Sequence, residues 1–537
     1  MNPKKAALVA IGWLHLFLPV ASRSHEEGQR LGKVDFAVSC SDGSRAAFNT
    51  AVAMLHNFWY PQSVNAFNEI LKTDPGCAMA YWGVAVGERT NPLVGAAPAA
   101  LAKRGADAIE TAKGLGGKTQ RERDFIAAMD VYYEGWGTRE FATRVLAYEK
   151  AMQEMWLRYP GDVEVALFYA LALNEAIPVS APDKTYSRHI KAAGICEKVL
   201  AKQPDHPGGL HYQIHSYDYP ALATRGVAAA DRYASVATSA PHALHMPSHV
   251  YSMLGMWNES IQSNLSALGV AKAYVHAMDF SAYAYLQMAQ DRQAERLMNE
   301  SLAVQKASGG AFQRSPTGGV LPVYTAYAAI PARFALERGA WSEAAALELR
   351  PSAPPADAIT HFARAVGFAR LGNTASARQE ISKLQALRGE LADSKQDYWA
   401  EQVDIQHKAA SAWAAQAEGQ RAEALKLMRS AADLEDASEK SVAMENRLWP
   451  MRELLGELLL EQREPAMALK EFEASLREAR NRLRGYYGAA RAAELTGDRS
   501  KAKAFYEKIV ALTKNADSDR SEIRRAKAFL ATIAGDR

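Results

Sequence analysis

The stretch RGAWSEAAAL (residues 338–347) contains the pattern that decides the fold: a glycine, a short turn, and a small residue five positions after the glycine. Glycine permits a tight turn between two helices, and the small residue lets the second helix pack closely on the first. The pattern recurs in LGMWNESI (254–261), LGNTASARQEI (371–381), EGQRAEALKL (418–427) and TGDRSKAKAF (496–505), with degenerate copies in AQDRQAERL (289–297) and REPAMALKEF (463–472).

The spacing of these turns indicates a helical repeat. Successive turn positions are 34, 50, 33, 47, 44 and 34 residues apart. A step of 34 is the period of the tetratricopeptide repeat (TPR), which has two antiparallel helices per unit. No useful stretch alternates with period two, so strands are not expected. We therefore predict an all-α solenoid of TPR-like helix-turn-helix repeats.

The two halves of the chain differ in regularity. At 537 residues the chain exceeds one compact core. The N-terminal half also has a helical pattern but is less regular, and a loop rich in Gly, Ser and Pro occupies 308–322. We expect a decorated N-terminal domain over 23–305 and a more regular TPR array over 306–537.

The charge balance excludes some classes of partner. The 63 basic and 60 acidic residues give a net charge of +3, too small to favour nucleic acid or an anionic membrane, and no basic run is interleaved with aromatics. The N-terminus has the pattern of a secretory signal: Lys4 and Lys5, an apolar run from Ala6 to Ala21, and small residues for cleavage near Ser22. We expect residues 1–22 to be a signal peptide and the mature chain to have no membrane span. An uncleaved anchor is the alternative, although the apolar run is shorter than the ~20 residues of a spanning helix.

The three cysteines fit an exported protein. Cys40 and Cys77 are the natural pair for a disulfide, which would contribute about 4 kcal/mol on the chain-entropy model. Cys196 lies on an expected helix core face and is interpreted as an inert buried thiol.

Seven of the thirteen histidines fall within 71 residues: His206, and six more in the motifs HYQIH, HALHMPSH and HAMD. Residues three or four apart share a helix face, and neutral imidazole is a common ligand of transition metals. The predicted metal ligands are His211, His215, His245, His249 and His276, with His242, Asp218 and Asp279 as further ligands or orienting partners. His206 is interpreted as a loop residue. Because Pro247 disfavours the α conformation at Met246, His242 and His245 are expected in a turn before a helix that begins at Pro247.

Nitrogen-rich ligation suits zinc, copper and iron and does not choose among them. The competing interpretation is that these histidines are buried polar groups, hydrogen-bonded to backbone, Tyr or Asp. No HExxH motif supports a zinc protease, and paired ExxH motifs of di-iron bundles are missing.

The mature chain resembles, nearly end to end, a broad group of exported bacterial tetratricopeptide-repeat proteins. The resembling stretches include residues 54–86, 118–133, 183–220, 240–267, 276–291 and 484–498. The resemblance implies the repeat solenoid and a periplasmic or secreted location, and carries no established activity.

Two classes of function follow. The first is an interaction scaffold whose repeats hold a protein or peptide partner, with a histidine-rich transition-metal site. The second is a metal-dependent enzyme, hydrolytic or oxygen-using, with its site at the three histidine motifs.

Overall fold

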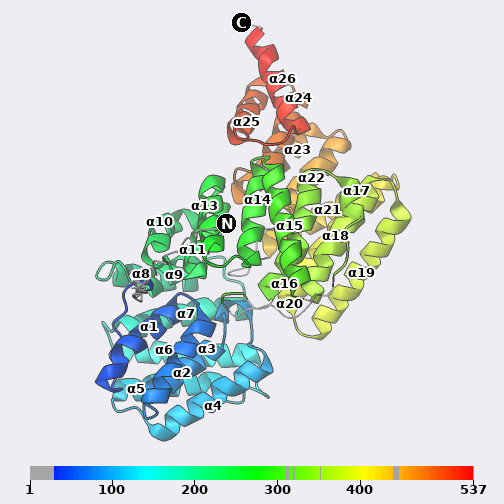
Figure 1. Cartoon of the computed structure of the whole chain (residues 1–537). Coiled ribbons are helices and arrows are strands. Elements are labelled where there is room, and N and C mark those ends of the chain that lie inside the picture. The colour runs from blue at the N-terminus through cyan, green and yellow to red at the C-terminus, as the bar shows by residue number, and fades with distance from the viewer. Residues whose placement is uncertain (1–28, 309–314, 318–320, 351, 439–446, 536–537) are drawn as a thin grey trace, which may run out of the picture.

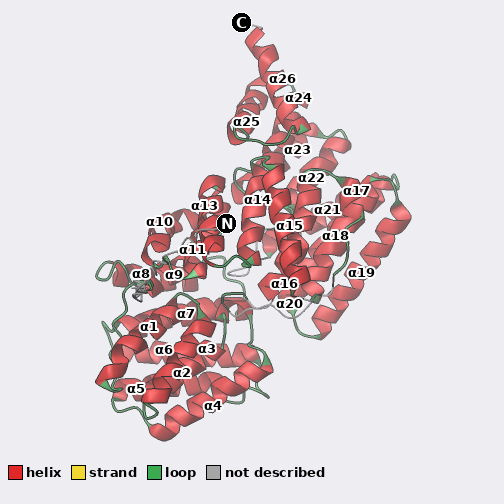
Figure 2. Ribbon diagram, viewed as in Figure 1, coloured by secondary structure: helices red, strands yellow, loops and turns green. Residues whose placement is uncertain are grey.

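The computed structural model is all-α and describes residues 29–308, 315–317, 321–350, 352–438 and 447–535. No strand occurs in these ranges, and green loops join red helices throughout Figure 2. Among the same residues, no helix is both long and apolar enough to cross a bilayer.

The helices of the first half are α1 (Arg45–His56), α2 (Tyr60–Thr73), α3 (Ala78–Glu88), α4 (Ala99–Leu115), α5 (Gln120–Tyr133), α6 (Phe141–Arg158), α7 (Val163–Ala176), α8 (Ser187–Leu200), α9 (Pro207–Tyr217), α10 (Val227–Val236), α11 (Pro241–His245), α12 (Pro247–Leu254), α13 (Trp257–Val270), α14 (Val275–Gln287) and α15 (Asp291–Ala307). Those of the second half are α16 (Leu321–Glu337), α17 (Trp341–Ala345), α18 (Pro354–Arg370), α19 (Thr374–Asp393), α20 (Asp397–Ala417), α21 (Arg421–Ala437), α22 (Met451–Glu461), α23 (Pro465–Glu478), α24 (Leu483–Leu495), α25 (Arg499–Leu512) and α26 (Ser521–Gly535). Most helices pack mainly on a helix that is adjacent in sequence, while α11 packs chiefly on α13 and α16 on α14 and α18, which is the contact pattern of a solenoid.

The repeat turns have the backbone conformation that their sequence predicts. All seven turn positions adopt a positive φ, namely Gly255, Ala289, Gly339, Gly372, Gly419, Arg463 and Gly497. Only glycine adopts this conformation without steric cost, so Ala289 and Arg463 are held in it by the packing of the helices that they join. The small residue five positions later is buried in every copy. The all-α repeat solenoid predicted from the sequence is confirmed.

The solenoid curves so that its middle turns contact its C-terminal repeats. Trp257 Nε1 donates to the carbonyl of Asn481 at 2.8 Å, and the Asn481 side chain donates to the carbonyl of Gly255 at 2.8 Å. One repeat later, Arg520 pairs with Asp291. In Figure 1 the green helices α13 and α14 accordingly lie below the red helices near the C-terminus.

The three largest hydrophobic clusters occupy successive parts of the chain. One includes Phe36 to Leu222, a second Trp257 to Phe334, and a third Ala332 to Ala492. The predicted boundary near residue 305 lies at the end of α15, inside the sequence range of the second cluster.

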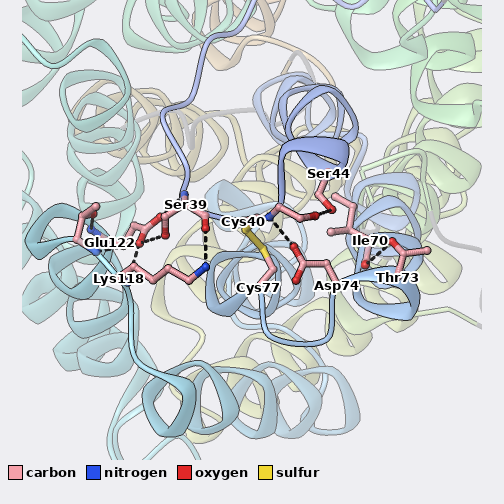
Figure 3. Close-up of a disulfide and its surroundings, with 11 residues drawn as sticks. Ser39, Cys40, Ser44, Ile70, Thr73, Asp74, Cys77, Lys118 and Glu122 are labelled. Carbon is pink, nitrogen blue, oxygen red and sulfur yellow. Dashed lines mark hydrogen bonds between the residues drawn. A yellow bond between two sulfur atoms is a disulfide. The ribbon is translucent and has the colours of Figure 1, made fainter.

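Cys40 and Cys77 form a disulfide that fastens the N-terminal segment to the start of α3, with Cα atoms 4.9 Å apart. Figure 3 shows the polar contacts that surround it. The backbone N–H of Ser41 donates to Asp74 at 2.8 Å, and Glu122 accepts from the backbone and hydroxyl of Ser39 at 2.7 and 2.6 Å. The segment before α1 is therefore held at several points.

Candidate metal centre

The cluster histidines lie on the first helix of three successive repeats. These helices begin at residues 207, 241 and 275, which are 34 residues apart, and the second of them consists of α11 and α12. Helix α12 packs on both α9 and α14, so the three first helices are neighbours in space. Figure 1 shows α9 and α11 close together, with α14 farther along the solenoid.

The predicted helix start at Pro247 is confirmed, but the prediction that His242 and His245 lie in a turn was wrong, because both lie in α11. Met246 has right-handed helical angles, φ −52° and ψ −37°, and it joins α11 directly to α12. The Met246 N–H donates to His242 O at 2.9 Å, while Pro247 occupies a first-turn position that needs no donor. Full burial of Met246 stabilises the conformation that proline disfavours. His242 and His245 are therefore helical residues.

Six histidines form two groups of three. In each group one nitrogen per ring lies within 4.8 Å of the other two. The first group is His211, His215 and His242, and the second is His245, His249 and His276. All six side chains are at most 5% exposed. The five predicted ligands are divided between the two groups, His211 and His215 in the first and His245, His249 and His276 in the second.

In the second group, hydrogen bonds to the Nδ1 atoms of His245 and His249 determine which ring nitrogens carry protons. His245 Nδ1 lies 2.6 Å from Asn264 Oδ1, and Asn264 turns this oxygen toward the ring because its Nδ2 donates to Ser260 O. His249 Nδ1 lies 2.7 Å from the Asp218 carboxylate. Both Nδ1 atoms must therefore donate, and in neutral rings both Nε2 atoms carry lone pairs.

These two Nε2 atoms face each other at 3.0 Å. Two ligands of one tetrahedral ion with bonds of about 2.0–2.1 Å would be about 3.3 Å apart, so the spacing is close to that of a shared ion. Two lone pairs at this distance repel each other. A cation between His245 and His249, either a metal ion or a proton, would remove this repulsion.

The first group also brings two nitrogens face to face, but they belong to His211 on α9 and His242 on α11 rather than to two histidines of one segment. His211 Nδ1 donates to the carbonyl of His56 at 2.6 Å, so its Nε2 is bare, and this atom lies 3.1 Å from His242 Nε2. His242 Nδ1 lies 3.0 Å from the hydroxyl of Tyr274, which can donate or accept. If Tyr274 donates, His242 can hydrogen-bond to His211 without a metal. If Tyr274 accepts, two lone pairs again converge.

Burial disfavours protonation in both groups. It lowers the pKa of His211 to about 3, against a small opposing effect of the His56 carbonyl. Burial also lowers the pKa of His242 and His245 well below the usual range, and neighbouring histidines lower it further. Neutral imidazole is the form that binds metal.

One phenylalanine packs against each group. The Phe58 ring centroid lies 4.3–5.6 Å from those of the three rings of the first group. The Phe280 centroid lies 4.8–5.1 Å from those of the second. Such contacts restrict the rings to one orientation and surround them with apolar surface.

His206, interpreted from the sequence as a loop residue, is buried at the start of α9. Its Nε2 lies 3.1 Å from Glu164, and His56 Nε2 lies 2.9 Å from the same carboxylate. Burial alone would raise the pKa of Glu164, but the two histidines hold it well below its usual value. The carbonyl of His56 accepts a hydrogen bond from His211 Nδ1. The cluster of His56, His206 and Glu164 therefore helps to fix the position of the first group.

The two predicted aspartates have different surroundings. Asp218 is fully buried and contacts His249, as an orienting partner would. Asp279 pairs with Arg333 at 3.2 Å. Cys196, predicted to be inert, is buried on α8, and burial raises the pKa of its thiol far above the usual range.

Sequence reasoning did not find Asn264, Tyr274, Phe58 and Phe280. These residues carry no ligand motif, and Phe58 is about 150 residues from the nearest histidine that it contacts. A usable signal existed for the grouping itself, because His211, His215 and His242 recur 34 residues later as His245, His249 and His276.

No family model matches the chain, and no curated protein matches it. Among solved structures, a tetratricopeptide repeat protein from Parabacteroides merdae is 11% identical over 68% of this chain and 98% of its own, with a TM-score of 0.24. A structure of the human IFIT1 dimer with PPP-AAAA is 11% identical over 88% of this chain and 96% of its own, with a TM-score of 0.38. At these scores the fold assignment depends on the helices and turns of this chain itself.

Proposed function

We propose that this chain is an exported TPR-like metalloprotein that binds transition-metal ions, of the zinc, copper or iron class, at the seams between successive repeats. The observation that carries the proposal is the contact between His245 and His249, whose Nδ1 atoms both donate and whose Nε2 lone pairs face each other. A proton held between the two Nε2 atoms would also relieve this repulsion. The third histidine near the same point favours a metal ion, because a shared proton needs only two nitrogens.

Export and membership of the exported bacterial repeat family belong to the same proposal. The disulfide between Cys40 and Cys77 supports an oxidising compartment, periplasmic or extracellular. The expected signal peptide, residues 1–22, lies outside the described residues.

Elemental analysis of the purified mature protein tests metal binding. We expect at least one equivalent of bound metal and a higher melting temperature with metal than after chelation. H211A and H249A should each lower the metal content, because they change different groups. H407A is the matched control, since His407 lies on α20, away from both groups. Less than about 0.1 equivalent of metal after reconstitution, with unchanged thermal stability, contradicts the proposal. A proton between His245 and His249 would then be the remaining explanation of their close contact.

A scaffold function is a second candidate, supported by a cleft of about 430 Å³. Its lining joins Tyr219 and Trp257 of the N-terminal half to Arg452 and Arg480 of the C-terminal repeats. The mixture of aromatic and charged side chains suits a peptide. A partner that depends on the cleft should be released by R480E and retained by R429E, which changes an exposed residue of α21 outside the lining.

The enzyme interpretation is supported by the number of ligands. Three histidines per group leave a coordination position open, as in catalytic zinc sites, where water or an oxidant could bind. Turnover that is lost together with the metal in H249A would support it.

A further inference from the structure

The two histidine groups are copies of one site, repeated at the period of the fold. Each ligand of the first group has its counterpart in the second, 34 residues later: His211 and His245, His215 and His249, His242 and His276. The helices that carry them start 34 residues apart as well. Whatever ion the first group binds, the second therefore offers it the same three ligands.

The repetition places the two groups side by side because they share one helical segment. In each group two histidines come from one first helix and the third comes from the next. The segment formed by α11 and α12 gives His242 to the first group and both His245 and His249 to the second. Ring centroids across the boundary are 6.0 Å apart for His242 and His245, and 6.1 Å apart for His215 and His249.

The charge around the groups distinguishes among metals. All six ligands are imidazoles, which carry no negative charge. The two carboxylates predicted near them are already engaged, Asp218 with His249 Nδ1 and Asp279 with Arg333. Two divalent ions would bring four positive charges into a fully buried site, which is very costly without anionic ligands. Two univalent ions bring half that charge. Copper is the imidazole-binding metal that has a stable univalent state, and as a divalent ion it also binds nitrogen ligands most tightly.

We infer that the two groups form a single two-copper centre, with one ion held by three histidines in each group and both ions univalent when reduced. The inference rests on the proposed metal binding and adds the metal, the number of ions and their proximity. Oxidation to two Cu(II) ions carries the charge cost given above, so it needs an excess of a strong oxidant. Each copper gives one electron to ferricyanide, so that two ferricyanide ions are reduced for each protein molecule.

Copper loading without oxygen tests the number of ions. The full-length mature protein should bind two equivalents of Cu(I) against a chromophoric chelator. H242A disables the first group and H276A the second, so each should retain about one equivalent, while H407A should retain two. Circular dichroism melts identify any variant that fails to fold, and the stoichiometry of the unmodified protein needs no variant.

Electron paramagnetic resonance after oxidation with ferricyanide tests proximity. Two nearby Cu(II) ions should give a dipolar-broadened spectrum, or less signal than two independent spins, together with a half-field transition. H242A and H276A should give a single normal Cu(II) spectrum. Two equivalents with two sharp, independent spectra would overturn the shared centre while leaving metal binding intact. Stoichiometric zinc or iron without copper binding would overturn the choice of metal, and absence of any metal would overturn the proposed function itself.

Discussion

Acidification should destabilise the metal-free protein, because three histidines of the two groups are held neutral by burial. The pKa of His211 is lowered to about 3, and those of His242 and His245 lie well below the usual range. In the unfolded chain each ring regains a pKa of about 6.5. The unfolded state therefore binds more protons below this value, and stability is lost as the pH falls from about 6.5 toward the folded-state pKa.

The size of the effect follows from the unfolded-state pKa alone. At pH 5 an unfolded histidine lies about 1.5 pH units below its pKa, which corresponds to about 2 kcal/mol for each ring that stays neutral in the folded state. Three rings give about 6 kcal/mol, comparable to the whole stability of many proteins. Other groups change the total in both directions: burial also lowers the pKa of His56 and His189, which adds to the loss, and it raises the pKa of Glu175 and Asp279, which opposes the loss.

Urea denaturation followed by far-UV circular dichroism measures the effect on chelator-treated protein at pH 7.5, 6 and 5. The midpoint should fall steeply below pH 6.5, and H245N should remove about 2 kcal/mol of the difference between pH 7.5 and pH 5. A change of less than about 1 kcal/mol over this range would refute the reasoning, since it would mean that the rings are already protonated in the folded protein. Bound metal should flatten the curve down to the pH at which protons displace it.

Three further outcomes are expected. D218N should weaken metal binding about 10- to 100-fold in a chelator competition, while D231N, on the neighbouring helix, should leave it unchanged; equal affinities in both variants would contradict the orienting role. G208A should lower the free energy of unfolding by about 1–3 kcal/mol, because the added Cβ would lie 2.5 Å from His56 Nδ1, whereas G194A meets no atom within 4 Å and should not destabilise its helix. Reduction of the disulfide should cost up to about 4 kcal/mol in chemical denaturation, and an unchanged midpoint would show that the N-terminal segment is held by its hydrogen bonds alone.

The repeat turns were predictable from sequence because each depends on local chemistry. A glycine in the left-handed conformation and a small residue one turn into the next helix define the hairpin, and the neighbouring copies identify the degenerate ones. Ala289 and Arg463 adopt the same conformation although their residue types disfavour it. The repeat period is therefore stronger evidence for a turn than the residue at the turn.

The sequence predicted the region that contains the histidine cluster, but not which side chains form each group. Spacing places His211 and His215 on one face, but it does not say which ring of the next repeat completes the group. The partners that fix the protons, Asn264 and the carbonyl of His56, come from a second helix and from a segment about 155 residues away. The local rule for Pro247 failed because it describes a dipeptide, whereas packing of the buried segment determines the conformation.

Substitutions one repeat before and one repeat after the two groups limit the number of histidine groups to two. One period beyond the second group, the positions of His245 and His249 are occupied by Asp279 and Tyr283, and Arg333 neutralises the aspartate. One period before the first group, the position of His242 is occupied by Gly208, and the absence of a side chain there makes room for the His56 ring that supports His211 from behind. A solenoid repeats any ligand set at its own period, so the number of ions is determined by where the substitutions fall. In this chain they fall one repeat on either side of two complete groups.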